Sequence, residues 1–460
     1  MISVLMSSSF KVVLSLKKNW QMNRFVIFFL SLVLFVIHLD LFQHVWRQCY
    51  SLGRPLGERW TFLLFYTVLL AILSFGFNAY RLGRLRPVEL AYSQGIALFF
   101  VNFITYWELC LFQGRLVSVR AIIGLLGVQI IFIVIWSVAA GWLYRKLFPP
   151  LKMLIIYNGA FCQKEKLVEK IRQHPEHFLI VGTLDCRQPE EVLFRELERQ
   201  EAVMLYDLPV SQYDLLLPFC LARSICVYLT PTVSDILLQS SEEVFSSGPL
   251  IRCIKNQGLT AGQRFAKRML DLTASFFCLI IASPCMAVIA LAIKCYDGGP
   301  VFFRQKRCTI NGKIFSIIKF RSMVVDAEKD GIFQPQNNTD PRITPIGRFL
   351  RKTHLDELPQ LFHILAGTMS FVGPRPERIE HVQEYTKHLP EFAFRLKVKG
   401  GLTGYAQVMG AYNTSAYDKL KLDLIYIQNY SLFLDLKLIL LTIKGILFHP
   451  GSDEQTPFLE

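Results

Sequence analysis

The feature that most constrains this chain is a series of long apolar segments near its N-terminus. Four of them lie at Phe25–Phe42, Trp60–Tyr80, Val88–Phe112 and Val117–Tyr144. Each approaches the ~20 residues with which an α-helix crosses the hydrocarbon core of a bilayer. Hydrophobic residues make up 52% of the chain, more than a water-soluble surface usually allows. We therefore expect residues 1–148 to form a four-helix transmembrane region.

The basic residues around these segments predict their orientation. Lys and Arg are denser before the first segment, between the second and third, and after the fourth than in the other two connections. Cytoplasmic connections carry the excess of basic residues in membrane proteins. This bias favours a multi-pass protein with both ends of the four-helix region, and the residues that follow it, in the cytoplasm.

Residues 149–255 have a different pattern, in which short apolar runs alternate with polar helical stretches. The apolar runs Lys152–Tyr157, Phe178–Thr183, Ala202–Tyr206 and Ile225–Leu229 are strand-like. Strands that alternate with helices indicate a small parallel α/β domain. The turn after its first strand, Asn158–Ala160, lacks the GxGxxG pattern that brings a pyrophosphate close to the backbone. We expect a degenerate Rossmann-like domain with a structural or regulatory role, ahead of nucleotide binding.

A third unit is predicted over residues 264–450, followed by a tail at 451–460. It opens with the apolar segment Leu272–Ile293, which has Ser283 and Pro284 at its middle. Proline removes a backbone donor and bends a helix, and the serine hydroxyl can cap the group that is freed. We expect a re-entrant membrane helix at about 268–294 that enters and leaves on one face. An ordinary kinked transmembrane helix is the alternative, and it would place the downstream residues outside.

The strongest candidate for chemistry is the pair Asp356–Glu357. Pro359 fits the first turn of a helix that ends at Gly367, so both carboxylates fall at or just before a helix N-terminus. Acidic residues there often only complement the helix dipole. The arginines on either side of the pair indicate a catalytic role, because phosphoryl transfer needs carboxylates beside guanidinium groups. The acids can hold Mg²⁺ or attack phosphorus.

The net charge is consistent with a phosphorylated partner. The chain carries 50 Lys and Arg against 36 Asp and Glu, a formal charge of +14. Charge alone does not separate nucleic acid, anionic lipid and phosphorylated metabolites. The basic residues lie beside acids and prolines rather than in a stripe with exposed aromatics, so we expect no nucleic-acid partner.

Six motifs in one order resemble the bacterial sugar transferase family of polyprenyl-phosphate hexose-1-phosphate transferases. The four leading apolar segments and the α/β domain resemble its long, polytopic branch. The motifs are Arg268-Met-Leu-Asp271, Ser283-Pro284, Lys319-Phe-Arg-Ser-Met323, Leu355-Asp-Glu-Leu-Pro-Gln-Leu361, Gly373-Pro-Arg-Pro376 and Gly401-Leu-Thr-Gly-Tyr-Ala-Gln407. The fold that this resemblance implies is a membrane helical bundle, a small Rossmann-like domain and a mostly α-helical catalytic domain with a re-entrant helix.

The resemblance implies a two-step reaction at the cytoplasmic face of the bacterial inner membrane. Asp356 matches the family's nucleophile, which attacks a UDP-hexose, releases UMP and passes the phosphosugar to undecaprenyl phosphate. Glu357 helps to bind Mg²⁺, with Asp356, or acts as the acid/base partner. The expected phosphate-binding residues are Arg351, Arg375, Arg321, Lys319 and Arg342. His354 departs from the Ser or Thr usual in the family, and we assign it no role.

Several points stay open at this stage. The pathway would be the start of exopolysaccharide, capsule or O-antigen synthesis, and no motif identifies the hexose. A catalytically inactive membrane scaffold for polysaccharide assembly is the alternative, although inactive relatives normally lose acids or arginines that are present here. Leu432–Phe448 is an interfacial helix or a buried core helix. A homo-oligomer is possible.

Overall fold

The computed structural model describes residues 2–49, 56–83, 85–159, 168–169, 171, 178–244, 251–254, 258–325, 340, 342–410 and 415–448. The predicted tail at 451–460 lies outside the described residues, as does most of the polar stretch between the strand-like runs Lys152–Tyr157 and Phe178–Thr183. The chain divides into two compact units, Met1–Thr232 and Val233–Glu460.

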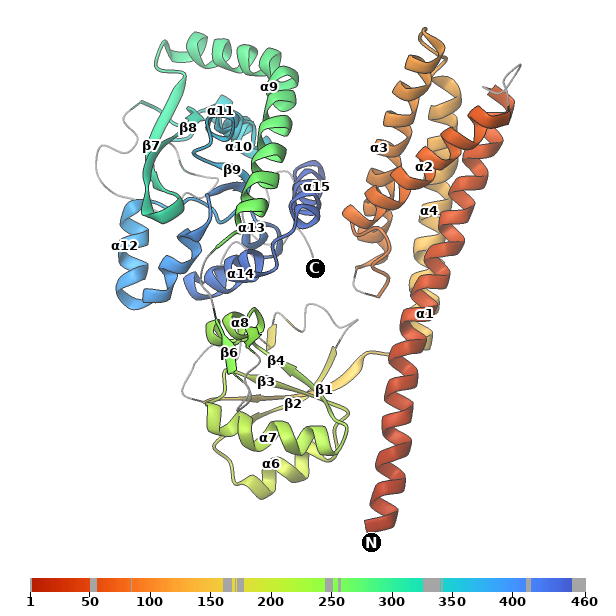
Figure 1. Cartoon of the computed structure of the whole chain (residues 1–460), viewed down its shortest axis with the longest axis vertical. Helices are drawn as coiled ribbons and strands as arrows, with labels where there is room; N and C mark the ends of the chain where they lie inside the picture. Colours follow the sequence, from red (N-terminus) through yellow and green to blue (C-terminus); the bar gives the residue numbers. More distant parts are fainter. Residues whose placement is uncertain are drawn as a thin grey trace. The chain divides into compact units, whose positions relative to one another are not determined.

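The first unit begins with the four predicted apolar helices (Figure 1). These are α1 (Ile2–Cys49), α2 (Leu56–Gly76), α3 (Pro87–Gln113) and α4 (Arg120–Leu147). Met22–Val45 within α1 and the whole of α3 and α4 are long and apolar enough to cross a membrane, whereas the apolar stretch Trp60–Gly76 of α2 is shorter. The chain is therefore a membrane protein.

A buried polar triangle holds three of these helices together. Gln129 of α4 donates from Nε2 to the Tyr66 hydroxyl of α2 at 2.9 Å and accepts from Asn102 Nδ2 of α3 at 2.8 Å. The Tyr66 ring stacks on Phe42 of α1 with 3.9 Å between centroids. Polar side chains that bond across helices fix which faces meet, because leaving them unpaired in an apolar interior is costly.

A four-stranded parallel sheet follows, in the order β2-β1-β3-β4. Its strands are β1 (Leu151–Tyr157), β2 (Phe178–Asp185), β3 (Ala202–Tyr206) and β4 (Cys226–Leu229), which confirms the four predicted strands. Helices α6 (Glu190–Leu197) and α7 (Val210–Ala222) pack together on one face of the sheet (Figure 1). The Rossmann-like interpretation of this region agrees with the topology.

The second unit consists mainly of helices joined by short strand pairs. Helix α8 (Val233–Gln239) belongs to this unit, because its Val233 and Ile236 are buried in the unit's main core. The other elements are β5 (Glu242–Val244), β6 (Ile251–Cys253), α9 (Ala261–Asp297), β7 (Phe302–Cys308), η1 (Ile310–Gly312), β8 (Ile314–Phe320), α10 (Pro345–Thr353), η2 (Leu355–Glu357), α11 (Gln360–Ala366), β9 (Ser370–Val372), α12 (Ile379–His388), η3 (Pro390–Lys397), β10 (Gly401–Thr403), α13 (Tyr405–Met409), α14 (Ala416–Gln428) and α15 (Leu432–Phe448).

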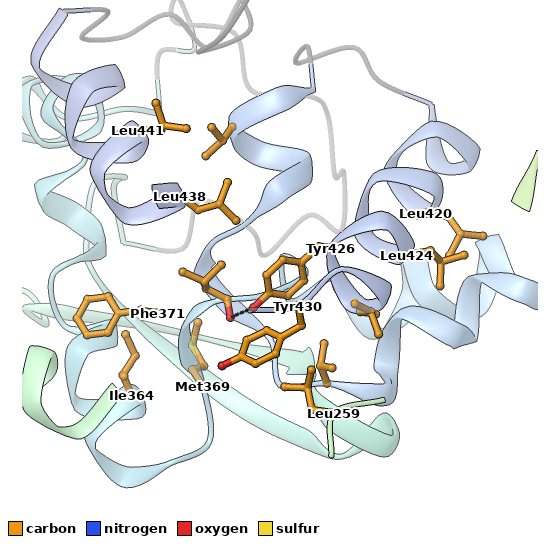
Figure 2. Close-up of a cluster of buried hydrophobic side chains, with 14 of the residues drawn as sticks. Leu259, Ile364, Met369, Phe371, Leu420, Leu424, Tyr426, Tyr430, Leu438 and Leu441 are labelled. Atoms are coloured by element: carbon orange, nitrogen blue, oxygen red, sulfur yellow. Dashed lines mark hydrogen bonds between the residues drawn. The ribbon is translucent and has the colours of Figure 1, made fainter. Parts of the chain in front are cut away.

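The core of this unit is apolar and continuous. Figure 2 shows Ile364, Met369 and Phe371 with side chains from α14 and α15, such as Leu424 and Leu438. For α15, the buried-core alternative is confirmed on one face of the helix, and the interfacial alternative stays a prediction. Its Leu438 and Leu441 are fully buried, whereas Leu432, Phe433 and Leu436 are exposed.

Helix α9 bends within its length, as Figure 1 shows. Pro284 has no N–H with which to bond the Ile280 carbonyl four residues earlier, and the Ser283 hydroxyl donates to that oxygen at 2.9 Å. The serine thus replaces the hydrogen bond that the proline removes, as the sequence predicts. Substitution of the serine by alanine would leave the carbonyl without this donor.

Both halves of α9 pack against the same unit. Leu279, before the break, contacts the main core, and Ile289 and Ile293, after it, pack with Phe320 and Leu350. A straight helix of 37 residues would be about 55 Å long and would carry one end away from the domain. The bend keeps both ends on it, while apolar side chains such as Ile281 and Val288 remain exposed.

Candidate active site

The predicted carboxylate pair lies in a tight turn between two helices. Helix α10 ends at Thr353, and His354 adopts a left-handed conformation with φ 56° that reverses the chain into η2, which contains both Asp356 and Glu357. Pro359 then precedes α11, and Gly367 ends it at φ 86°. The prediction that the acids stand just before a helix bounded by this proline and glycine is confirmed.

Glu357 is held between two cations from distant parts of the chain. Its Oε1 accepts from Lys319 Nζ at 2.5 Å and lies 3.6 Å from Arg375 Nη2. Burial alone would raise the pKa of this carboxyl, but the positive charges of Lys319 and Arg375 outweigh it and lower the pKa to about 2. Glu357 is therefore ionised at neutral pH and cannot donate a proton there.

Asp356 has the opposite electrostatic environment, although it is the adjacent residue. Burial raises its pKa above the usual value of 3.8, and the neighbouring Glu357 charge raises it further. Lys319, His354 and Arg351 act against this shift. Two adjacent carboxyls whose environments move their pKa values apart have different chemical roles in many active sites.

Arg375 is aimed at Glu357 by a loop packed tightly on a neighbouring strand. A Cβ on Gly373 would come within 2.4 Å of the Lys399 carbonyl oxygen, and one on Gly404 within 2.2 Å of the Gly373 oxygen. The two glycine motifs of the sequence thus meet backbone to backbone. Two further arginines hold the loop carbonyls, since Arg395 Nη2 donates to Arg375 O and Arg307 Nη1 to Pro376 O, each at 3.1 Å.

Arg395 and Arg307 are residues whose roles the sequence did not reveal. Arg395 is buried and paired with Asp423, its Nη2 lying 2.8 Å from Oδ2. Burial and the nearby Arg375 charge lower the pKa of Arg307 to about 10, which keeps it positive at neutral pH. Arg307 lies near the end of β7, where a bridge to Arg378 and the hydrogen bond to Pro376 O bring it beside the loop that carries Arg375.

The other predicted phosphate-binding residues are divided between the site and its surroundings. Arg351 acts on the charge of Asp356, and its Nε donates to Ser322 Oγ at 2.9 Å. Arg321 instead pairs with Asp297 at the end of α9, and Arg342 pairs with Asp340 at 2.6 Å. Within the described ranges of the chain, the predicted cations that lower the pKa of Asp356 or of Glu357 are Lys319, Arg351 and Arg375.

The membrane helix α9 is tied directly to the segment that bears the acids. Arg268 donates from Nη1 to Ile364 O at 2.7 Å and from Nη2 to Leu365 O at 2.8 Å, at the C-terminal end of α11. One turn later, Asp271 accepts from Ser370 Oγ and Phe371 N of β9, both at 2.9 Å. The Arg268–Asp271 motif therefore fixes α11 and β9 to α9.

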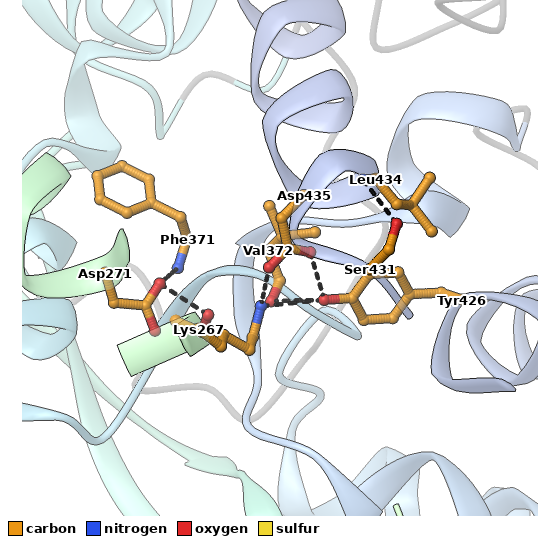
Figure 3. Close-up of polar contacts among 9 residues, drawn as sticks. Lys267, Asp271, Phe371, Val372, Tyr426, Ser431, Leu434 and Asp435 are labelled. Atoms are coloured by element: carbon orange, nitrogen blue, oxygen red, sulfur yellow. Dashed lines mark hydrogen bonds and ion pairs between the residues drawn. The ribbon is translucent and has the colours of Figure 1, made fainter. Parts of the chain in front are cut away.

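A second buried pair joins α9 to α15 (Figure 3). Lys267 Nζ lies 2.6 Å from Asp435 Oδ2 and donates to the Tyr426 hydroxyl at 3.0 Å. The Tyr426 hydroxyl donates to Asp435 Oδ1 at 2.7 Å. Because each member of this network is paired, the charges are compensated within the unit.

The residues at the site fit a magnesium ion that is bound by the protein together with substrate phosphates. They fit less well to an ion that is enclosed by protein ligands alone. Among the described residues, no group of three or more His, Cys, Asp or Glu side chains could hold a metal. Mg²⁺ is commonly bound by one or two carboxylates together with substrate phosphates and water. Asp356 and Glu357 supply two carboxylates, although one oxygen of Glu357 is occupied by Lys319.

Comparison with known proteins is consistent with this arrangement. Residues 262–449 match the model of the bacterial sugar transferase family, and this range contains every residue of the site. The chain is 31% identical over 380 residues to the UDP-glucose:undecaprenyl-phosphate glucose-1-phosphate transferase of Escherichia coli K12, which covers 78% of this chain and 79% of the relative.

Other relatives match a smaller share of the chain. A protein with the same description from Klebsiella pneumoniae is 40% identical over 227 residues, 48% of each chain, so the match spans about half the length of that relative. The UDP-N-acetylgalactosamine-undecaprenyl-phosphate N-acetylgalactosaminephosphotransferase of Aeromonas hydrophila is 39% identical over 191 residues, 41% of this chain and 45% of the relative. The names of these relatives differ in the sugar.

Proposed function

Because this chain belongs to the bacterial sugar transferase family, we propose that it transfers hexose-1-phosphate from a UDP-hexose to undecaprenyl phosphate and releases UMP. The relatives named above act on UDP-sugars and undecaprenyl phosphate. The observation that carries the proposal is the site itself, where Asp356 stands beside an ionised Glu357 clamped by Lys319 and Arg375.

In the first step, a carboxylate oxygen of Asp356 attacks the phosphorus that bears the hexose. The bond from this phosphorus to the bridging oxygen of the diphosphate breaks, and UMP leaves with the electron pair. The product is an acyl phosphate on Asp356 that carries the sugar. The raised pKa of Asp356 is compatible with this role, because a carboxylate that is poorly stabilised when charged is a better nucleophile.

In the second step, a phosphate oxygen of undecaprenyl phosphate attacks the same phosphorus. The acyl phosphate bond breaks, Asp356 leaves as a carboxylate, and a lipid-linked diphosphate sugar forms. Both steps concentrate negative charge on phosphate oxygens, and guanidinium groups bind such oxygens in a bidentate manner. Arg375 and Arg351 act on the charges of the two carboxylates and would bind these phosphate oxygens together with Lys319, while Arg307 holds the loop through Pro376 O.

Glu357 acts in its ionised form in this proposal. A pKa of about 2 excludes it as a general acid at neutral pH. Its charge instead orients Lys319 and Arg375 and contributes, with Asp356, to holding Mg²⁺. When bound, Mg²⁺ would neutralise charge on the diphosphate of the donor.

We further propose that α9 is re-entrant and that the second unit is cytoplasmic. Both halves of the bent helix pack on that unit while its outer face remains apolar, so the helix can dip into the bilayer and return. Arg268 and Asp271 would then fix the reactive acids at the level of the lipid acceptor. Transfer to a lipid at this face would start the synthesis of an exopolysaccharide, capsule or O-antigen.

The function is tested by incubating membranes that contain the chain with undecaprenyl phosphate and a panel of UDP-sugars, with and without Mg²⁺. We expect UMP release with at least one UDP-hexose, dependent on both acceptor and Mg²⁺, together with a lipid-linked sugar. Absence of UMP release with every sugar would contradict the proposal and favour an inactive scaffold.

The topology is tested by cysteine labelling in a background whose native cysteines are replaced by serine. Lys313 is exposed on the turn between β7 and β8, and Leu116 is exposed between α3 and α4. Lys313→Cys should react with a membrane-impermeant reagent only after the cells are permeabilised, whereas Leu116→Cys should react in intact cells. Reaction of Lys313→Cys in intact cells would rule out the re-entrant arrangement.

A further inference from the structure

We propose that the turn between α3 and α4 binds the phosphate group of an anionic membrane lipid. An open hollow of about 720 Å³ lies at this turn, lined by Gln113, Arg115, Leu116, Ser118 and Arg120 among others. Binding sites for small ligands commonly have volumes in this range. The site lies outside the second unit and is independent of the transferase chemistry.

The position of the turn suits a lipid headgroup. It joins two helices that are each long and apolar enough to cross a membrane, at the ends where both leave their apolar stretch (Figure 1). Such a turn falls at the boundary between hydrocarbon and water, where lipid phosphates lie. Trp107, six residues before the end of α3, is exposed, as is typical of aromatic side chains at this boundary.

The two arginines of the hollow have no acidic partner. Arg115 Nε makes only a long contact of 3.5 Å with Gln113 Oε1, and in the part of the chain that the structure describes neither Arg115 nor Arg120 pairs with a carboxylate. Arg199 and Arg223, exposed elsewhere in the same unit, each pair with a glutamate. Two guanidinium groups that lack a carboxylate partner and lie beside one hollow can bind a phosphate in a bidentate manner.

The backbone of the turn is already fixed. Tyr106 of α3 donates from its hydroxyl to Val117 O at 3.1 Å, and Val117 N donates to Cys110 Sγ at 3.5 Å. Gly114 takes the left-handed conformation at φ 63° that ends α3. A ligand that binds here does not need to order the turn, so little conformational entropy opposes binding.

Apolar side chains around the hollow favour a lipid over free phosphate. Leu116, which lines the hollow, is 76% exposed, and Leu111 and Ile123 on the adjoining turns of α3 and α4 are also exposed. Side chains of this kind are compatible with acyl chains and offer nothing to inorganic phosphate. The combination of two free arginines with an apolar rim therefore indicates a phosphate that is attached to acyl chains.

The test measures lipid binding to the delipidated full-length protein by native mass spectrometry. The probes are phosphatidylglycerol, diacylglycerol with the same acyl chains, and inorganic phosphate as competitor. The variant R115Q/R120Q removes both arginines of the hollow. Its matched control, R145Q/K146Q, removes two basic residues from the last turn of α4, at the opposite end of that helix.

Wild type and R145Q/K146Q should bind phosphatidylglycerol with similar affinity. R115Q/R120Q should bind it about thirtyfold more weakly, which corresponds to about 2 kcal/mol for the loss of the charged contacts that two guanidinium groups make to one phosphate. Unchanged affinity in R115Q/R120Q would overturn the proposal. Equal binding of diacylglycerol by wild type, or displacement of phosphatidylglycerol by inorganic phosphate at equal concentration, would overturn it as well. These two wild-type comparisons decide the matter if R115Q/R120Q does not fold.

Discussion

The sheet of the first unit and the loops of the second unit use their charged residues in different ways. In the first unit, Arg223 and Glu198 form a pair whose side chains are 42% and 52% exposed. In the second unit, the side chains of Arg395 and Asp423 are 3% and 1% exposed, and Glu357 is shared by two cations. Exposed pairs contribute little to stability, whereas buried charges must be compensated.

This contrast makes the less regular region of the second unit the candidate for the chemistry. A parallel α/β sheet commonly binds ligands at the carboxyl ends of its strands, and Asp185 and Asp207 stand there. Yet among the described residues, the convergence of several cations on adjacent carboxylates belongs to the loops around η2. The fold alone would have pointed to the sheet, and the distribution of charge points to Asp356.

Substitution of Asp356 should produce the largest effect. Asp356→Asn removes the attacking oxygen's charge, and we expect transfer to fall by about 10³-fold or more, as for other covalent nucleophiles. Asp185→Asn, the same change at the edge of the sheet, should leave transfer near the wild-type rate. The rate of UMP release, normalised to the amount of folded protein in membranes, checks both. Equal losses in the two variants would remove the distinction between the regions.

Loss of the buried Arg395–Asp423 pair should have the largest effect on the stability of the protein. Arg395→Met leaves Asp423 charged and unpaired in the core, at a cost of about 3–5 kcal/mol. Arg223→Met at the exposed pair should cost less than about 1 kcal/mol. Thermal unfolding of the purified variants in one detergent compares them. If Arg395→Met lowers the transition temperature no more than Arg223→Met does, the second unit is not held together by this pair.

Removal of Arg375 should affect donor binding at the site. Arg375→Ala deletes a guanidinium that faces Glu357, and we expect kcat/KM for the UDP-hexose to fall by about 10- to 100-fold, the usual cost of a charged contact to phosphate. Arg378→Ala, three residues further along the chain, serves as the matched control and should change it less. Steady-state kinetics at saturating acceptor provide the measurement, and unchanged kcat/KM in Arg375→Ala would exclude this residue from the site.

A change of pH dependence is the smallest expected effect. The nucleophile must be ionised, so the rate should fall as the pH drops through the raised pKa of Asp356. Lys319 lowers that pKa, and Lys319→Met should therefore move the acid limb of the residual activity to higher pH. Lys313→Met, exposed on the same hairpin, should not move it. A shift of the limb to lower pH in Lys319→Met would contradict the assigned electrostatics.

Local patterns in the sequence predicted the turn that holds the acids. Pro359 and Gly367 mark the ends of α11 through backbone preferences that need no distant partner, and Ser283 and Pro284 mark the break in α9 for the same reason. The strands of the first unit were equally accessible from short apolar runs. Where a conformation depends only on residues that are neighbours along the chain, the local sequence is sufficient to predict it.

The partners of the site depend on long-range packing and could not be predicted. Arg307 reaches a carbonyl 69 residues away, and Arg268 reaches carbonyls 96 and 97 residues away. No periodicity relates such positions. Arg321 and Arg342, which the sequence predicts to bind phosphate, pair with Asp297 and Asp340 in the structure, and the sequence did not indicate these acidic partners.

The most direct measurement is the search for a phosphohexose bound to Asp356. The purified protein would be mixed with UDP-hexose and Mg²⁺ in the absence of acceptor, quenched and analysed by peptide mass spectrometry, while UMP is followed. We predict one burst of UMP per active site and a hexose-phosphate adduct on the peptide that contains Asp356, which disappears when undecaprenyl phosphate is added. Accumulation of lipid-linked product with no adduct at Asp356 would contradict the account.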